Sequence, residues 1–115
     1  MKCLITGGAG FVGSHIAERL LGDGHDVVVL DNFASGRREN LATMAANPAL
    51  VLHEVDIADF AKAAPHFKDV DWVFHIAALA DVVPSIEQPM KYHHSNVDGT
   101  MATLEASRQA GVKRL

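Results

Sequence analysis

A short apolar strand, a glycine-spaced turn and a helix follow one another within residues 1–15, and few folds accommodate this arrangement. Gly7, Gly10 and Gly13 are spaced three residues apart. In such a turn the first glycine lets the chain leave the strand tightly and the second lets backbone N–H groups approach phosphate oxygens. The third lets the helix pack against the sheet. Unpaired N–H groups of a helix that starts near Phe11 would face the anion, so this segment predicts a dinucleotide site.

A second apolar run, residues 26–30, ends at Asp31, eighteen positions after Gly13. A carboxylate at the tip of a second strand can accept hydrogen bonds from both ribose hydroxyls of an adenosine, and it repels a 2′-phosphate. Asp31 therefore favours NAD over NADP. Arg37 and Arg38 leave an alternative open, because they could neutralise a 2′-phosphate or simply begin a solvated helix.

Apolar runs and helical patterns alternate along the rest of the chain. We expect strands at residues 2–6, 26–30, 50–54 and 71–75, and helices at residues 11–21, 37–46, 57–67 and 86–110. This alternation requires an α/β fold with a parallel, doubly wound sheet and right-handed crossovers. A cofactor would lie across the carboxyl ends of the strands, at the switch point between the first and fourth strands.

Side-chain spacing gives expected buried faces for the two longest helices. Val12, Ile16 and Leu20 share one face of the first helix. Ser85 could cap the last helix, with Pro89 in its first turn and Gly111 at its end. The expected buried face of that helix consists of Met90, Val97, Met101 and Leu104.

Residues 112–115 resemble the entry to a fifth strand. We therefore interpret residues 1–115 as the N-terminal part of an NAD(P)-binding domain, a Rossmann-type doubly wound parallel sheet truncated at the start of strand five. An isolated chain of this kind would leave the edge of the fourth strand and one helix face uncovered, which invites self-association.

The composition excludes several classes of protein. With 49% hydrophobic and 21% charged residues, the 115-residue chain has the make-up of an ordinary globular domain. A net charge of −4 without a basic stripe argues against nucleic acid as a partner. No apolar stretch reaches the ~20 residues of a membrane span. The single cysteine, Cys3, lies in a strand and permits no disulfide framework, so we expect a cytoplasmic protein.

Several polar residues are further candidates for site residues. Asp56 could accept a hydrogen bond from the adenine amine or could cap a helix. His75 could act as a general base, although a histidine that ends an apolar strand is more often a hydrogen-bonded core residue. Asn96 and Thr100, one helical turn apart, could contact the cofactor, tie down the loop after the fourth strand or simply form a solvated or packed face.

The chain shows no set of residues suited to catalysis or to metal binding. Its only tyrosine is Tyr92 and position 96 is asparagine, so a Tyr-x-x-x-Lys motif is absent. His93 and His94 are adjacent and therefore lack the spacing of a metal-binding pair. We expect a cofactor site, no metal and no catalytic residue within this chain.

Five segments together resemble a known family. They are residues 6–13 (TGGAGFVG), 31–40 (DNFASGRREN), 56–57 (DI), 73–78 (VFHIAA) and 96–100 (NVDGT). In this order they resemble the extended short-chain dehydrogenase/reductases, specifically the NAD-dependent epimerase/dehydratase family and its UDP-glucose 4-epimerase-like members. The resemblance covers essentially the whole chain and is specific for the family but not for the substrate.

The resemblance implies a function. In that family a tightly bound NAD transiently accepts hydride from a nucleotide sugar, while a tyrosine deprotonates a sugar hydroxyl. Epimerisation, dehydration or decarboxylation follows, depending on the member. The family's catalytic Ser/Thr, its Tyr-x-x-x-Lys and its nucleotide-sugar domain would lie beyond Leu115. The resemblance further implies a UDP-sugar substrate and a homodimer, and it implies that residues 1–115 alone bind NAD weakly and catalyse nothing.

The resemblance also implies contacts with the cofactor. Phe11 and Val12 would contact the pyrophosphate, and Asp56 and Ile57 would flank adenine. The adenosine ribose and its phosphate would meet Asp31, Asn32, Ala34, Ser35 and Gly36. The nicotinamide side would meet Ile76, Ala77, Ala78 and Ala80, and Ser95 takes a position where relatives often carry a cofactor-contacting Asn. Ala80 stands where some epimerases have Lys, which weakens an assignment to that activity alone.

Two other functions remain open on the sequence. One is an NADP-dependent carbonyl reductase of the same superfamily, which a preference for a 2′-phosphate would support. The other is a non-catalytic dinucleotide sensor or interaction domain, which a stable monomer that binds NAD at full stoichiometry would support.

Overall fold

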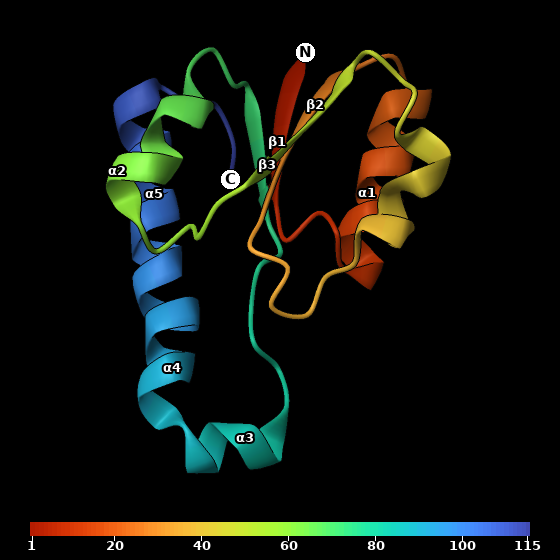
Figure 1. The fold of residues 1–115 in the computed structure, drawn as a ribbon. Coiled ribbons are helices and arrows are strands. Elements are labelled where there is room, and N and C mark those ends of the chain that lie inside the picture. The colour runs from red at the N-terminus through yellow and green to blue at the C-terminus, as the bar shows by residue number, and fades with distance from the viewer.

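A four-stranded parallel sheet forms the centre of the structure, a computed structural model that describes residues 1–115 (Figure 1). Its strands are β1 (Lys2–Thr6), β2 (Asp26–Asp31), β3 (Leu50–Glu54) and β4 (Trp72–His75). They lie in the order β3-β2-β1-β4, with Cys3 of β1 between Val27 of β2 and Trp72 of β4. The chain therefore builds outward from β1 to β3 and then crosses to the other side of β1, which places the switch point between β1 and β4 as expected.

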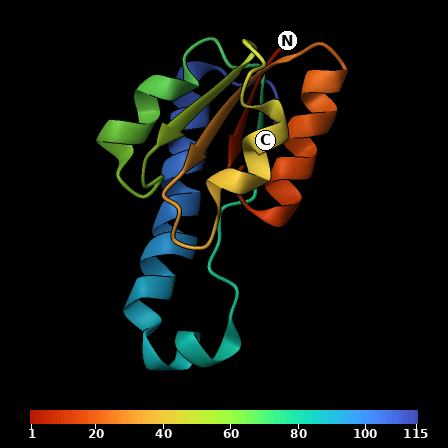
Figure 2. The same ribbon diagram turned by 45° about the vertical axis from the view of Figure 1, so that its right-hand side comes forward.

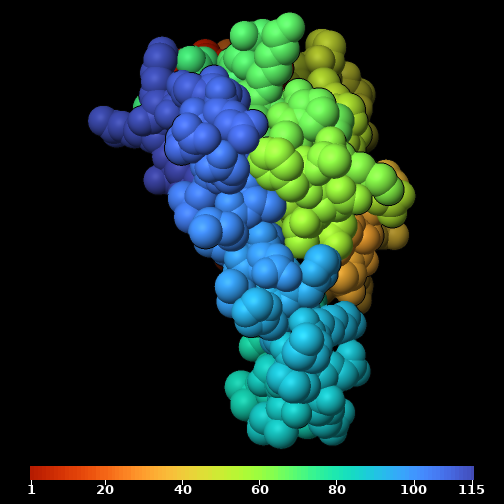
Figure 3. Space-filling view, turned by 90° about the vertical axis from the view of Figure 1, so that its left-hand side faces the viewer, coloured from red at the N-terminus to blue at the C-terminus, as the bar shows by residue number.

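Helices cover both faces of the sheet. They are α1 (Phe11–Gly22), the 3-10 helices η1 (Arg38–Met44) and η2 (Ala64–Phe67), α2 (Phe60–Ala63), α3 (Val82–Glu87), α4 (Pro89–His93), the π-helical turn η3 (His94–Asp98) and α5 (Gly99–Ala110). Figure 2 shows α1 and η1 on one side of the strands and α2 and α5 on the other. Figure 3 shows the α3–α4 segment extending beyond the body of the molecule below α5. None of these helices is long and apolar enough to cross a lipid bilayer.

Side chains of β1 alternate between two buried clusters. Cys3 and Ile5 belong to the cluster that also contains Ala17 of α1. Leu4 belongs to the cluster on the opposite face, together with Phe67 of η2. Both faces of a doubly wound sheet are covered, which explains why its strands are uninterrupted apolar runs instead of alternating apolar and polar residues.

The expected buried face of the last helix is wrong. Met90 and Met101 are 80% and 66% exposed, and Val97 and Leu104 are also exposed. The residues of α5 that face the core are instead the small ones, namely Gly99, Thr103, Ala106 and Ser107. Small side chains let the helix come close to the sheet layer: a Cβ on Gly99 would lie 3.0 Å from Cδ1 of Ile57.

The expected start of that helix is also wrong. α3 begins at Val82, and Ser85 lies inside it, where its hydroxyl donates to the Val82 carbonyl. Gln88 then leaves the helical region (φ −131°, ψ 60°) and Pro89 starts α4. A residue that precedes proline is driven away from the α conformation, whereas proline itself suits the first position of a helix.

Two other expected helices are shorter or of another type. Within the expected helix 37–46 the structure has only the 3-10 helix η1 (Arg38–Met44), and within 57–67 it has the single α turn of α2 (Phe60–Ala63) followed by the 3-10 turn η2 (Ala64–Phe67). The capping residue of α2 is Asp59, whose side chain accepts from the Lys62 N–H, so Asp56 is not a helix cap. In α1 the buried residues are Gly13, Ser14, Ala17 and Leu20, whereas Val12 is 55% exposed.

The residues after α5 lie beside β4. The Val73 N–H donates to the Arg114 carbonyl (2.8 Å), and Trp72 and Arg114 form an isolated parallel bridge. This pairing has the geometry expected at the entry to a further parallel strand.

A cleft at the carboxyl edge of the sheet

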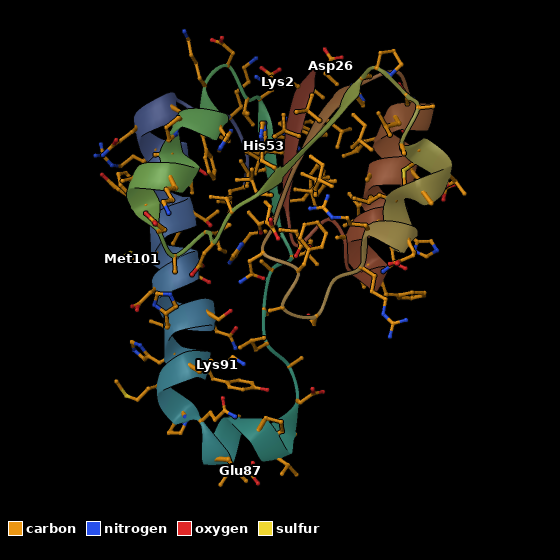
Figure 4. All side chains as sticks on the ribbon, viewed as in Figure 1. Lys2, Asp26, His53, Glu87, Lys91 and Met101 are labelled. Atoms are coloured by element: carbon orange, nitrogen blue, oxygen red, sulfur yellow. The ribbon has the colours of Figure 1, made fainter.

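A cleft of about 400 Å³ lies at the carboxyl ends of the strands, between the start of α1 and the α4–η3 helix. Its lining combines backbone-rich turns, apolar side chains and a few polar groups. The lining residues are Gly7, Gly10, Phe11, Val12, Leu30, Asp31, Asn32, Ala34, Ser35, Val55, Asp56, Ile57, Ile76, Ala77, Ala78, Leu79, Lys91, His94 and Ser95. In Figure 4, Lys91 lies on α4 beyond the carboxyl edge of the sheet, whereas Lys2 and Asp26, the first residues of β1 and β2, lie at its opposite end.

The glycine turn is packed too closely for side chains at two of its positions. Gly7 has φ +72°, and a Cβ there would lie 2.8 Å from the Cα of Ala77. At Gly13 a Cβ would lie 2.2 Å from the Gly7 carbonyl oxygen. Only glycine lets β1 turn in this way while the loop after β4 and the first turn of α1 both approach it.

The N-terminus of α1 opens into the cleft without a capping side chain. Gly10 takes the N-cap position in extended conformation and forms no side-chain hydrogen bond to the helix. The first N–H groups of a helix have no partner within it, and the helix dipole adds positive charge there. Phe11 and Val12 line the cleft at this point, so the backbone beside them can bind an anion.

Asp31 is a buried carboxylate that holds the glycine turn to the end of β2. Its Oδ2 accepts from the Ala9 N–H (2.9 Å) and its Oδ1 from the Phe33 N–H (2.8 Å), and the residue is 7% exposed. Gly36 packs against it, since a Cβ there would lie 2.9 Å from Oδ2. Each carboxylate oxygen has a second lone pair for a ligand hydroxyl. The residue type suggested only a ligand role, and the bond to Ala9 was not apparent in the sequence.

Neither arginine that followed Asp31 in the sequence lines the cleft. The Arg38 guanidinium lies 4.3 Å from the ring centroid of Phe33 and 4.0 Å from the Glu54 carboxylate. The Arg37 N–H donates to the Ala9 carbonyl, which also accepts from the Asn40 side chain (2.8 Å). The segment after β2 therefore stabilises the glycine turn through hydrogen bonds to the Ala9 carbonyl.

Asp56 joins the loop after β3 to the helix across the cleft. Its Oδ1 accepts from the Ala58 N–H (3.0 Å), and its Oδ2 lies 3.1 Å from Nε2 of His94. Ile57 is 7% exposed and presents an apolar surface beside this carboxylate. An apolar face next to a hydrogen-bond acceptor suits a purine ring with an exocyclic amine.

His75 is a structural residue within a hydrogen-bonded chain. The Thr6 Oγ1 lies 2.7 Å from His75 Nδ1, and the Thr100 Oγ1 lies 2.8 Å from His75 Nε2. Because the Thr100 hydroxyl donates to the Asn96 carbonyl (2.6 Å), it accepts from His75, which assigns the ring proton to Nε2. Burial lowers the pKa of the His75 ring, so the neutral form is favoured.

The loop after β4 is held at both ends by side chains. Thr6 Oγ1 accepts from the backbone N–H groups of Ile76 and Ala77 (3.1 and 3.3 Å). Asn96 accepts from the Leu79 N–H and donates to the Leu79 carbonyl (both 2.8 Å). Of the roles considered for Asn96 and Thr100, the structure thus shows that Asn96 ties this loop to the helix, whereas Thr100 holds the last residue of β4, His75.

Most residues that the sequence suggested as cofactor contacts lie around this one cleft. Gly13, Gly36 and Ala80 do not line it: the first two pack behind the turn and Asp31, and Ala80 lies past Leu79. The residues that the sequence did not suggest are Leu30, Val55, Leu79, Lys91 and His94. Lys91 lies four residues before Ser95, which is one helical turn, so this spacing could have indicated Lys91 as a residue on the same helix face. His94 lies directly before Ser95 and has no such spacing.

Comparison with known proteins places nearly the whole chain in one family. The model of the family described as "NAD dependent epimerase/dehydratase family" matches residues 3–115. UDP-glucose 4-epimerase of Mycolicibacterium smegmatis is 41% identical over 117 residues, which cover 100% of this chain and 37% of that protein. UDP-glucuronic acid decarboxylase 1 of Arabidopsis thaliana is 37% identical over 115 residues, which cover 100% of this chain and 25% of that protein.

Solved structures match the fold over nearly all of the chain. DesIV, a dTDP-glucose 4,6-dehydratase from Streptomyces venezuelae with NAD bound, superposes with a TM-score of 0.93 and 38% identity, over 99% of this chain and 38% of that one. The Thermus thermophilus UDP-glucose 4-epimerase in complex with NAD superposes with a TM-score of 0.85 and 42% identity. The match covers 97% of this chain and 35% of that one. The chain thus spans little more than a third of these proteins.

Proposed function

This chain belongs to the NAD-dependent epimerase/dehydratase family, and we propose that its cleft binds NAD for an enzyme that acts on a nucleotide sugar. The observation that carries the proposal is the meeting of three features at one edge of the sheet. They are the close-packed glycine turn, the uncapped start of α1 and the buried carboxylate of Asp31. Together they supply donors for a pyrophosphate and acceptors for a ribose.

The residues in the cleft fit the parts of NAD in order along it. The N–H groups at the start of α1, beside Phe11 and Val12, would hold the pyrophosphate. Asp31 would accept the ribose hydroxyls of the adenosine half, with Asn32, Ala34 and Ser35 around them. Asp56 and Ile57 would take the adenine, and Ile76, Ala77 and Ala78 the nicotinamide side.

The choice of NAD over NADP follows from the charges near the ribose. A 2′-phosphate would meet the Asp31 carboxylate in a buried setting, where like charges repel strongly. The nearby cation, Arg38, is stacked on Phe33 and faces Glu54. The proposal therefore names NAD, and a 2′-phosphate preference in solution would contradict it.

Bound NAD would supply a hydride acceptor for oxidation of a sugar carbon and a hydride donor for the return step. The residues of this chain would bind and orient it: the Asn96–Leu79 pair and Thr6 fix the backbone against which the nicotinamide side would lie. His75 uses both ring nitrogens within the fold, so it is not proposed as the base. A nucleotide sugar as substrate is proposed because the relatives named above act on UDP- or dTDP-sugars.

Calorimetric titration of the purified chain with NAD and NADP tests the cofactor. We expect one NAD site and an affinity for NADP lower by about tenfold or more. Val12→Asp should weaken NAD binding by placing a carboxylate at the pyrophosphate, whereas Val51→Asp, an exposed valine on β3, should not. Equal effects of the two variants, or no NAD binding at all, would overturn the proposal.

A turnover assay with UDP-glucose tests the assignment of catalysis. Residues 1–115 should bind the cofactor without converting the sugar, because the chain contains no tyrosine–lysine pair at catalytic spacing. Formation of UDP-galactose by the purified 115-residue chain would show that this assignment is wrong.

A further inference from the structure

His94 lies between two carboxylates that come from different parts of the fold. Its Nε2 is 3.1 Å from Oδ2 of Asp56, in the loop after β3, and its Nδ1 is 3.4 Å from Oδ2 of Asp98, one helical turn further along η3. Carboxylate oxygens only accept hydrogen bonds, so both contacts are favourable only when both ring nitrogens carry protons. This geometry therefore selects the imidazolium form.

We propose that His94, in its protonated form, is a positioning residue that fixes Asp56 for the adenine of NAD and makes the affinity for NAD depend on pH. The proposal rests on the function proposed above, because it assigns a regulator to the same cleft. His94 and Asp56 both line that cleft, whereas Asp98 does not. The contact joins segments 38 positions apart in the sequence.

Protonation of His94 affects the proposed adenine site, formed by Asp56 and Ile57, in two ways. A donated hydrogen bond holds the Asp56 carboxylate in one orientation, with its Oδ1 already fixed by the Ala58 N–H. The added positive charge also offsets the two carboxylates beside it, which reduces repulsion of an anionic cofactor. Both effects strengthen NAD binding as His94 gains its proton.

The other charged groups around His94 do not reverse this sign. His93 lies 3.8 Å from the second oxygen of Asp98, and Lys91 lines the same cleft from α4. Asp31 lies across the cleft with both oxygens already bound to backbone N–H groups. Hydrogen bonding to Asp56, supported by Asp98, raises the pKa of the His94 ring above its ordinary value.

The decisive experiment is calorimetric titration with NAD from pH 5.5 to 8.5. In the wild-type protein NAD should bind about two- to fivefold more tightly at the acid end, which is the size expected for an exposed ion pair. His94→Gln keeps an amide donor near Asp56 but cannot titrate, so its profile should be flat. His93→Gln is the matched control and should keep the wild-type profile.

A variant outside the cleft distinguishes an effect of His94 protonation from an effect of side-chain packing around His94. Asp98→Asn removes one of the two carboxylates that favour the imidazolium, so the midpoint of the NAD profile should move to lower pH. By linkage, bound NAD should raise the pKa of His94, measured from its ring resonances by NMR. If His94 has a purely structural role, Asp98→Asn should not shift the midpoint of the NAD profile, and bound NAD should not change the pKa of His94.

The outcomes distinguish the two proposals. If NAD binds but the wild-type and His94→Gln profiles are the same, the role of His94 is wrong and the cofactor site stands. If NAD does not bind at any pH, the proposed function fails and the role of His94 fails with it.

Discussion

Asn96 pairs with both backbone groups of Leu79, accepting from its N–H and donating to its carbonyl at 2.8 Å each. The Asn96 side chain on η3 thus satisfies both backbone hydrogen-bonding groups of one residue in the loop after β4, as a paired strand would. That loop forms the side of the cleft assigned above to the nicotinamide half of NAD.

Removing this pair should loosen the loop. We expect Asn96→Ala to lower the free energy of unfolding by about 1–2 kcal/mol, the net value of two partly buried hydrogen bonds, and to weaken NAD binding. Urea denaturation and NAD titration measure the two effects. Asn47→Ala, which removes one exposed hydrogen bond to Ala49 far from the cleft, should leave NAD binding unchanged.

Two glycines of α1 should respond oppositely to the same substitution. Gly13→Ala should destabilise the fold by about 1–3 kcal/mol or more, because its Cβ would overlap the Gly7 carbonyl oxygen and backbone would have to move. At Gly22 a Cβ meets nothing within 4 Å, so Gly22→Ala should stabilise by about 0.5–1 kcal/mol through helix propensity. Thermal denaturation of the two variants makes the comparison, and equal stabilities would contradict the packing described for the turn.

Asp31 should matter for stability before any ligand is added. In Asp31→Asn one carboxylate oxygen becomes an NH₂ group, so either the Ala9 or the Phe33 N–H loses its acceptor. A buried donor left in this way costs about 1–3 kcal/mol. The variant should also bind NAD more weakly and discriminate less against NADP. Asp26→Asn, at the exposed start of the same strand, serves as the control; similar effects at the two positions would argue against the role of Asp31.

His75 should make the fold less stable toward acid. Its pKa is lowered by burial, so above pH 6.5 the ring is neutral in both folded and unfolded chains and the contribution is fully present. As the pH falls below 6.5, the unfolded chain takes up the proton first and stability is lost. The pKa of His94 is raised, so this residue gives the opposite pH dependence of stability. The quantity to measure is therefore the difference in the free energy of unfolding between wild type and a His75 variant at each pH. His75→Gln should flatten this loss between pH 6.5 and 5, and His15→Gln should not.

The strands were predictable because each contains a short apolar run that is bounded by polar or turn-forming residues; the runs of β1 and β2 are buried, whereas β3 is partly exposed. The predictions for β1 and β3 are confirmed at both ends, while β2 is one residue longer and β4 one shorter than expected. The doubly wound parallel sheet and its switch point between the first and fourth strands followed from the strand–helix alternation together with the glycine turn, and both are confirmed. Local pattern and a single crossover rule were sufficient for this level of structure.

The face of α5 was not predictable by the same reasoning. Large apolar residues at helical spacing indicate a face suited to burial, but they do not say against which surface. In this chain Met101 and Leu104 lie outside, and Thr103 and Ala106 approach the sheet. Contacts such as that between Asp56 and His94 were likewise invisible, because they depend on where two distant segments meet in space.

The hydrogen bonds around His75 have a direction. They run from the Ile76 and Ala77 amides through Thr6, the imidazole and Thr100 to the Asn96 carbonyl, and each link donates to the next. Aligned dipoles polarise one another, so no single hydroxyl can turn round without the rest following. The imidazole therefore acts as a spacer of fixed length, which sets the distance between the carboxyl end of β4 and the start of α5. Ile76 and Ala77, which follow His75 directly, form part of the cleft lining, so this spacer fixes the strand end from which that side of the cleft begins.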